Sequence, residues 1–129
     1  MKYLFVAYPN CVTCQNAKKW LDKHGIGYTQ RHIVEDRPTV EELKKWHAMS
    51  GLPLRRFFNT SGLVYKSMKL KDKLDTMSDE DQYELLATNG MLVRRPILVG
   101  ADFVLLGFKM PKWEAALLGN ENDMANGEQ

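Results

Sequence analysis

Apolar positions along the chain change from strand-like runs to helical repeats and back again. Residues 2–8 form a short apolar and aromatic run that Pro9 ends, which predicts a buried central strand. Residues 17–24 carry apolar side chains at helical spacing, and Gly25 is placed to end this helix in a left-handed conformation. Residues 26–34 alternate well enough for a second strand. The pattern therefore predicts a strand-loop-helix-strand unit, in which the two strands are parallel and the crossover is right-handed.

The middle of the chain has a helical pattern, and its last third returns to strands. Residues 38–90 contain helical repeats, and the first of these starts with a capping box at Thr39-Val40-Glu41-Glu42. Strand patterns resume at residues 95–100 and 103–107, separated by a hairpin turn, and Pro111 starts a last helix. This order favours an α/β fold with a thioredoxin-like (glutaredoxin-like) mixed four-stranded sheet. A helical insertion at about residues 38–90 interrupts that sheet in the middle of the chain.

The length and composition suit one globular domain. Of the 129 residues, we expect 1–118 to form a single thioredoxin-like domain and 119–129, rich in Gly, Asn and acidic residues, to be a disordered tail. A formal net charge of +2 is too small to indicate a nucleic-acid binder. No apolar run approaches the roughly 20 residues of a membrane helix, and no secretory signal is recognisable. We therefore expect a cytoplasmic protein with no direct nucleic-acid partner and no membrane partner.

The two cysteines stand three positions apart, between the first predicted strand and the first predicted helix. Free amides and the helix dipole stabilise a thiolate at a helix N-terminus, so Cys11 is predicted to be the nucleophile. Cys14 follows about one turn later, where it can resolve a mixed disulfide and form a redox disulfide with Cys11. Two alternatives stay open: a pair of buried apolar cysteines, and half of a zinc site. The sequence offers no second pair of ligands for a zinc site, because the three histidines show no close ligand spacing. We therefore expect no metal.

A second group of candidate residues is Arg94-Arg95-Pro96-Ile97, at the start of the third predicted strand. A proline at this place can hold a cis peptide bond and bring backbone close to the cysteine loop. Arg95 is placed to stabilise the nucleophilic thiolate or to bind an oxyanion. The alternative is a solvated basic pair before an ordinary trans-proline. We expect Asn10, Thr13 and Pro96 to contact the bound thiol or substrate.

Three segments in this order resemble the ArsC / Spx / YffB family, which is arsenate reductase-like and has a thioredoxin-like fold. The segments are Cys11-Val12-Thr13-Cys14-Gln15-Asn16-Ala17-Lys18-Lys19-Trp20-Leu21, Arg94-Arg95-Pro96-Ile97 and Leu105-Leu106-Gly107-Phe108, and the likeness covers about residues 3–118. The resemblance implies a helical insertion in that fold and the first cysteine as the redox centre. It also implies that the arginine before the proline is the electrostatic partner of that cysteine. These roles fall on Cys11 and Arg95.

The branches of this family imply different functions. Its arsenate reductases carry Cys-x-x-Ser and hold the oxyanion with three arginines. Here Cys14 stands in the place of the serine, and only Arg95 has a clear counterpart among those arginines. Residues 57–58 are phenylalanines in the region of the second arginine, and Phe108-Lys109 occupies that of the third. The Cys-x-x-Cys and Arg-Arg-Pro-Ile segments look more like Spx, a sensor of disulfide stress that binds the C-terminal domain of the RNA polymerase α subunit.

Two functions are therefore expected. The first is a cytosolic thiol-disulfide oxidoreductase resembling the arsenate reductases, with Cys11 as nucleophile and Cys14 as the resolving thiol. It needs no bound cofactor, since no glycine-rich dinucleotide fingerprint is present. Electrons would come from a thiol reductant of the glutathione, glutaredoxin or thioredoxin system, and the partner would be a thiol or disulfide protein or a small oxyanion. The alternative is an Spx-like redox-sensing transcriptional regulator whose disulfide is a switch and whose partner is the RNA polymerase alpha subunit.

Overall fold

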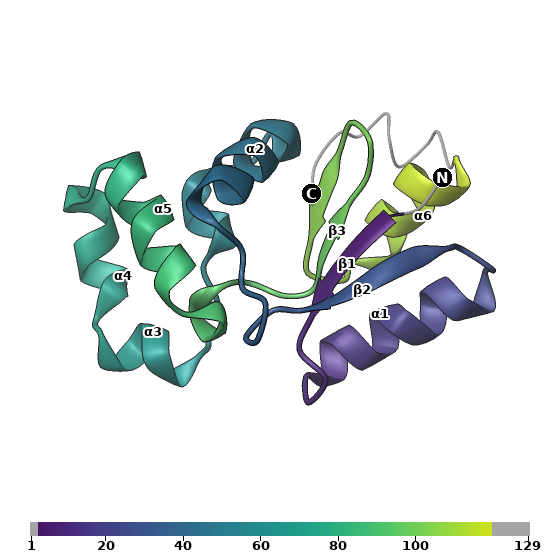
Figure 1. Ribbon diagram of the computed structural model, residues 1–129, viewed down its shortest axis with the longest axis horizontal. Coiled ribbons are helices and arrows are strands. Elements are labelled where there is room, and N and C mark those ends of the chain that lie inside the picture. The colour runs from purple at the N-terminus through teal and green to yellow at the C-terminus, as the bar shows by residue number, and fades with distance from the viewer. Residues whose placement is uncertain (1–2, 120–129) are drawn as a thin grey trace.

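A four-stranded mixed sheet forms the centre of the computed structural model, which describes residues 3–119 (Figure 1). The strands β1 (Tyr3–Ala7), β2 (Tyr28–His32), β3 (Ile97–Val99) and β4 (Val104–Leu106) lie in the order β2-β1-β3-β4. β1 pairs in parallel with β2 and antiparallel with β3, and β3 pairs antiparallel with β4. The predicted mixed sheet, with the first strand at its centre, is confirmed.

The third strand is shorter than the sequence pattern predicts. The pattern gave residues 95–100, whereas pairing starts only at Ile97. Pro96 has no amide proton to donate to a neighbouring strand, which explains why pairing does not start earlier. At the other end, the Gly100 amide donates to the Phe103 carbonyl with an N···O distance of 2.9 Å and closes the hairpin turn. The predicted hairpin is confirmed, and the predicted strand bounds are wrong by one or two residues.

Two helices cover one face of the sheet (Figure 1). α1 (Val12–Lys23) and α6 (Met110–Leu118) pack there against alternate side chains of the strands, such as Phe5 and Ala7 of β1. Trp113 of α6 is 1% exposed, and its ring meets that of Phe5 edge to face with the centroids 6.5 Å apart. Buried rings of this size are the largest single contributors to a core, so this layer fixes α1 firmly against the sheet.

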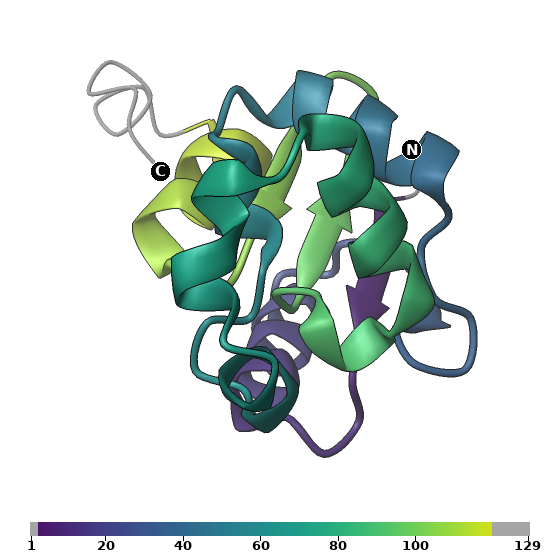
Figure 2. The same ribbon diagram turned by 90° about the vertical axis from the view of Figure 1, so that its left-hand side faces the viewer.

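The residues between β2 and β3 form the insertion, which covers the opposite face of the sheet (Figure 2). Its helices are α2 (Val40–Ser50), α3 (Leu63–Ser67), α4 (Leu70–Lys73) and α5 (Asp79–Thr88), with short 3-10 helices at Leu54–Phe57, Leu74–Thr76 and Gly90–Leu92. Phe57 and Phe58 are fully buried in this layer. No helix within residues 3–119 is long and apolar enough to cross a membrane. Gly119 ends α6 with a φ of 75°, and the rest of the predicted tail lies outside the described residues.

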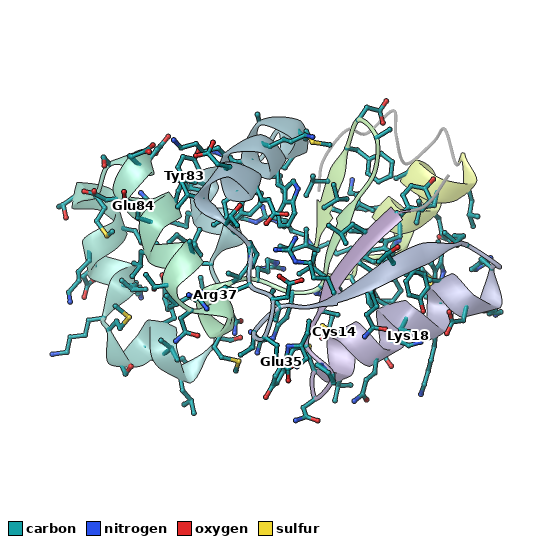
Figure 3. All side chains as sticks on the ribbon, in the orientation of Figure 1. Cys14, Lys18, Glu35, Arg37, Tyr83 and Glu84 are labelled. Atoms are coloured by element: carbon teal, nitrogen blue, oxygen red, sulfur yellow. The ribbon has the colours of Figure 1, made fainter. Side chains whose placement is uncertain are left out.

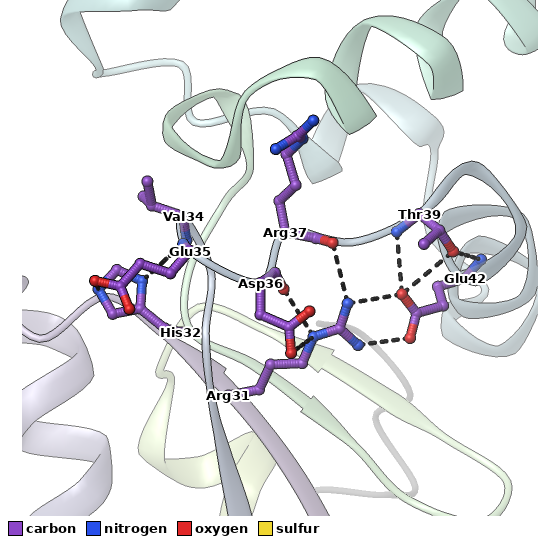
Figure 4. A network of polar contacts seen from close by, with 8 residues as sticks. All are labelled: Arg31, His32, Val34, Glu35, Asp36, Arg37, Thr39 and Glu42. Atoms are coloured by element: carbon purple, nitrogen blue, oxygen red, sulfur yellow. Dashed lines mark hydrogen bonds and ion pairs between the residues drawn. The ribbon is translucent and has the colours of Figure 1, made fainter.

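An ion pair between Arg31 of β2 and Glu42 of α2 ties the insertion to the sheet (Figure 4). The guanidinium donates two hydrogen bonds to the carboxylate, at 2.5 and 2.8 Å, and two more to the main-chain carbonyls of Asp36 and Arg37. The predicted capping box is present. The Thr39 hydroxyl accepts a hydrogen bond from the Glu42 amide, and the Glu42 carboxylate accepts one from the Thr39 amide. The hydrogen bonds from Arg31, supported by those from Thr39, lower the pKa of Glu42 to about 2.

Acid should weaken this ion pair over a defined pH range. The pKa of Glu42 is lower in the folded chain than its ordinary value of 4.5, so the unfolded chain takes up a proton first as the pH falls. The stabilisation is complete above about pH 4.5 and is lost as the pH falls toward about 2. We expect Glu42→Gln to lower the urea midpoint at neutral pH and to approach the wild type near the acid end of this range. The exposed Glu84→Gln variant is the control and should follow the wild type. A constant offset between the Glu42→Gln and wild-type curves at every pH would contradict this account.

Candidate active site

Cys11 is the N-cap residue of α1, directly after the loop that leaves β1. Its amide donates to the Tyr8 carbonyl with an N···O distance of 3.0 Å, which turns the chain from the strand into the helix. Its Sγ accepts a hydrogen bond from the Cys14 amide at 3.4 Å. The sulfur thus occupies the place of an N-cap oxygen, beside the free amides at the positive end of the helix.

Cys14 lies one turn into α1, where the helix meets the sheet, and is 3% exposed (Figure 3). Burial raises the pKa of Cys14 to about 12, and the neighbouring Cys11 sulfur acts in the same direction. The main chain of Tyr8 and the positive charge of Arg95 act in the opposite direction. Cys14 therefore keeps its proton at neutral pH, and Cys11 is the member of the pair that is free to react first.

Arg95 lies beside this pair and precedes a cis peptide bond. Its guanidinium lies over the ring of Tyr8, 5.4 Å from the centroid, and its Nη1 donates to the carbonyls of Met91 and Val93, both at 3.4 Å. Its Nε is buried and has no hydrogen-bond partner. These contacts hold a positive charge close enough to the cysteines to lower the pKa of Cys14 against the larger effect of burial.

A cavity of about 750 Å³ opens beside Cys11. Besides the start of α1, its walls come from residues 59–64, from Met91 with the two arginines that follow, and from residues 107–109. Main-chain hydrogen bonds join two of these walls, because the Arg94 amide donates to the Phe57 carbonyl at 2.8 Å and the Asn59 amide to the Leu92 carbonyl at 2.7 Å. This volume lies within the range of about 300–1,000 Å³ that is usual for small-ligand sites. The cavity can therefore hold a ligand next to the Cys11 sulfur.

The structure brings together some of the predicted site residues and not others. Cys11, Thr13 and Arg95 all line the cavity. Asn10 is exposed in the loop before α1, and Pro96 is buried at the start of β3; neither is part of the cavity lining. The Pro96 carbonyl instead accepts the Gly107 amide at 2.8 Å and so supports one wall from behind. The predicted contact of Asn10 and Pro96 with a bound thiol has no counterpart in this cavity.

Most of the cavity wall has no signal in the local sequence. Residues 59–62, Asn-Thr-Ser-Gly, are typical of a turn and indicate nothing about a ligand. The alternative of a solvated basic pair before a trans-proline is wrong, because the Arg94 Nε is buried and the Arg95-Pro96 peptide bond is cis. One signal was available in the topology. Arg94 precedes β3, Lys109 follows β4, and Cys11 follows β1. Because β3 pairs antiparallel with both of its neighbours, the start of β3 and the ends of β1 and β4 lie at the same end of the sheet.

A comparison with known proteins agrees with this geometry. The family model described as the ArsC family matches residues 6–116. The chain belongs to the ArsC family. The resemblance drawn from the cysteine, arginine-proline and glycine segments is thereby confirmed, as is the thioredoxin-like fold that it implied.

Individual proteins match over most of the chain. The uncharacterized protein YusI of Bacillus subtilis (strain 168) is 47% identical, over 88% of this chain and 97% of its own length. The regulatory protein MgsR of the same organism is 32% identical, over 81% of both chains. Among solved structures, that of an ArsC family related protein from Bacteroides fragilis has 61% sequence identity and a TM-score of 0.86, covering 88% of this chain and 96% of that one. The names of these similar proteins do not agree on one function.

Proposed function

We propose that this chain is a thiol-disulfide oxidoreductase in which Cys11 attacks and Cys14 resolves. The observation that carries the proposal is the position of the Cys11 sulfur, which accepts the Cys14 amide at the N-terminus of α1 and lines a cavity large enough for a ligand. A sulfur in such a place is a good nucleophile and is accessible to a disulfide. Cys14, protonated and one turn away, supplies the second thiol that a two-cysteine exchange needs.

The exchange takes place in two steps that conserve electrons. The Cys11 thiolate attacks one sulfur of a substrate disulfide, forms a mixed disulfide and releases the other sulfur as a thiolate. Cys14 then attacks the Cys11 sulfur, the second substrate thiolate leaves, and a Cys11-Cys14 disulfide forms. The proton that Cys14 loses is balanced by the proton that the released thiolate takes up from solvent. The substrate is reduced by two electrons, and the protein is oxidised by two.

The first step makes the second one easier. In the reduced protein the Cys11 sulfur is one of the influences that raise the pKa of Cys14, after burial. Once Cys11 is in a mixed disulfide, its sulfur carries no charge and no longer opposes ionisation of Cys14. The positive charge of Arg95, which favours the Cys14 thiolate, remains. Ionisation of Cys14 is therefore easier in the mixed disulfide than in the reduced protein, and burial opposes it in both.

A thiol reductant completes the cycle by exchange with the Cys11-Cys14 disulfide, which leaves the protein reduced and the reductant oxidised. Glutathione, glutaredoxin and thioredoxin are the classes of donor that fit this chemistry, and no bound cofactor takes part. Thiol reductants of this kind operate in reducing compartments, so the proposal includes a cytoplasmic location.

Multiple turnover is the test of this proposal. Hydroxyethyl disulfide in large excess over protein is supplied with glutathione or with a thioredoxin system, and the mercaptoethanol released is measured over time. With arsenate in place of the disulfide, the product measured is arsenite. We expect product to exceed the amount of protein many times and to fall to the background rate in Cys11→Ser. Thiol product that stops at two equivalents per protein, which is the yield of a single exchange, would contradict an enzymatic role.

Removal of the charge at Arg95 should slow the second step. Without that charge the pKa of Cys14 rises further, so a smaller fraction of Cys14 is thiolate in the mixed disulfide. We expect Arg95→Met to lengthen the lifetime of the mixed disulfide by about threefold to tenfold. Rapid acid quench followed by mass spectrometry measures this lifetime. Lys23→Met, at the far end of α1, is a control for loss of a charge, and an equal delay in both variants would refute the assignment.

A redox-sensing regulator is the second candidate, and the name of the 32% identical relative MgsR favours it. In that case the Cys11-Cys14 disulfide changes the affinity for a protein partner, for which the RNA polymerase alpha subunit is our expectation. Binding of that subunit to the reduced protein, the oxidised protein and Cys11→Ser would test this. Affinity that depends on oxidation, together with one turnover in the assay above, would support the regulator.

A further inference from the structure

The cavity beside Cys11 is strongly basic. Arg94, Arg95 and Lys109 line it, and no acidic residue of the described part of the chain does. Four other basic side chains have acidic partners: Arg31 pairs with Glu42, Arg55 with Asp75, Lys18 with Asp22 and Lys44 with Glu80. Within residues 3–119, no ion pair includes any of the three cavity cations. The positive charge is thus left for something that enters the cavity.

The two arginines differ in what they contact. The Arg95 guanidinium lies over the ring of Tyr8 and donates to two main-chain carbonyls, and its charge lowers the pKa of Cys14. Within residues 3–119, Arg94 makes no contact of either kind. Its Nε and Nη2 would both lie 3.1 Å from a Cβ added at Gly107, so the guanidinium lies directly on the backbone of a glycine with a φ of +70°. A side chain at position 107 would push Arg94 out of this place.

The environment of Arg94 opposes an unpaired charge. Its Nε is buried without a hydrogen-bond partner, which is unfavourable for a guanidinium group. Burial lowers the pKa of Arg94, and the nearby positive charge of Arg56 lowers it further. A carboxylate bound to Arg94 would satisfy the guanidinium with bidentate hydrogen bonds and offset the repulsion from Arg56.

We infer that Arg94, assisted by Lys109, forms a carboxylate-binding subsite that selects anionic disulfides as partners of Cys11. This inference rests on the proposed thiol-disulfide exchange and names its substrate class. The carboxylate can belong to a small thiol compound or to an acidic side chain next to a cysteine in a protein, since both present the same group. The bonds broken and formed are those of the exchange above; the carboxylate is bound and released unchanged.

Three aliphatic disulfides of similar size and different charge test the subsite: dithiodipropionate, hydroxyethyl disulfide and cystamine. The rate of attack by Cys11 on each is divided by the rate of a free small thiol with the same disulfide, which removes intrinsic reactivity. In the wild type we expect the order anionic, neutral, cationic. The ratio of the dithiodipropionate rate to the hydroxyethyl disulfide rate should fall about tenfold in Arg94→Gln, in line with the loss of one charge-assisted pair. It should fall less in Lys109→Gln, which is exposed and poses little risk to folding.

Lys23→Gln is the matched control, because it removes the same charge at the other end of α1. That end of the helix is about 18 Å from Cys11, which is beyond the screening length of about 8 Å at physiological salt. It should leave the ratio unchanged. An unchanged ratio in both Arg94→Gln and Lys109→Gln would overturn the subsite. Failure of Cys11 to react with any disulfide would instead overturn the proposed function. Two disulfide-linked cysteine peptides, one flanked by glutamates and one by glutamines, locate the source. A preference for the glutamate peptide as well as for dithiodipropionate extends the subsite to acidic protein partners, and a preference for dithiodipropionate alone restricts it to small thiol compounds.

Discussion

Cys14→Ser should trap the substrate on Cys11, and Cys11→Ser should abolish all covalent chemistry. Cys11 lines the cavity and caps α1 with its sulfur, whereas Cys14 is 3% exposed with its pKa raised by burial to about 12. Only Cys11 can therefore make the first attack. When serine replaces Cys14, no thiol remains one turn away to release the bound substrate, so the mixed disulfide persists.

Intact-mass spectrometry of protein treated with hydroxyethyl disulfide separates these outcomes. We expect the wild type to pass through an adduct and end two hydrogen atoms lighter, Cys14→Ser to end as a stable adduct, and Cys11→Ser to keep its mass. Turnover in Cys11→Ser should equal the background rate. A stable adduct on Cys14 in Cys11→Ser, formed as fast as that on Cys11, would contradict the assignment of nucleophile and resolving thiol.

Gly90→Ala should destabilise the whole domain. An added Cβ at Gly90 would lie 2.0 Å from the Ile33 carbonyl oxygen and 2.8 Å from the Cα of Val34. These are backbone atoms just beyond β2, so no side-chain rotation can relieve the clash, and the insertion would have to move away from the sheet. We expect a loss of about 3 kcal/mol or more in the free energy of unfolding, which is at the upper end for overpacking substitutions.

Urea unfolding followed by circular dichroism measures this loss. Gly27→Ala is the matched control, because nothing lies within 4 Å of a Cβ added there and Gly27 has no positive φ. It should be neutral or stabilise by about 0.4–1 kcal/mol through the unfolded chain. Equal midpoints for the two variants would show that the close approach of Gly90 to Ile33 does not hold the insertion in place.

Local sequence patterns predict the elements of this fold well because each element carries its own periodicity and its own ends. The capping box at Thr39 and the proline near the start of α6 both occur where the pattern placed them. Gly90 shows where such patterns fail. It reads as the end of a helix, whereas its role is a backbone contact with Ile33 across 57 positions of sequence, which no local pattern encodes.

The local sequence likewise predicts one part of the candidate site and not the rest. The position of Cys11 at a helix N-terminus follows from its place between a strand and a helix. The different surroundings of Arg94 and Arg95 do not follow from the local sequence, because they depend on residues far away in the chain. Arg95 lies over the ring of Tyr8, and Arg94 lies against Gly107. The contact of Asn10 with a bound thiol stays a prediction, since residues 59–64 and 107–109 line this cavity and Asn10 does not.

The redox equilibrium of the two cysteines tests the central claim most directly. The protein is equilibrated with reduced and oxidised glutathione at a series of ratios, quenched with acid, and its free thiols are counted by alkylation and mass spectrometry. We predict one reversible two-electron transition between the dithiol and the Cys11-Cys14 disulfide, at a potential between about −300 and −180 mV. Two thiols that remain free across the whole series, or a pair that forms only disulfides between chains, would contradict the account.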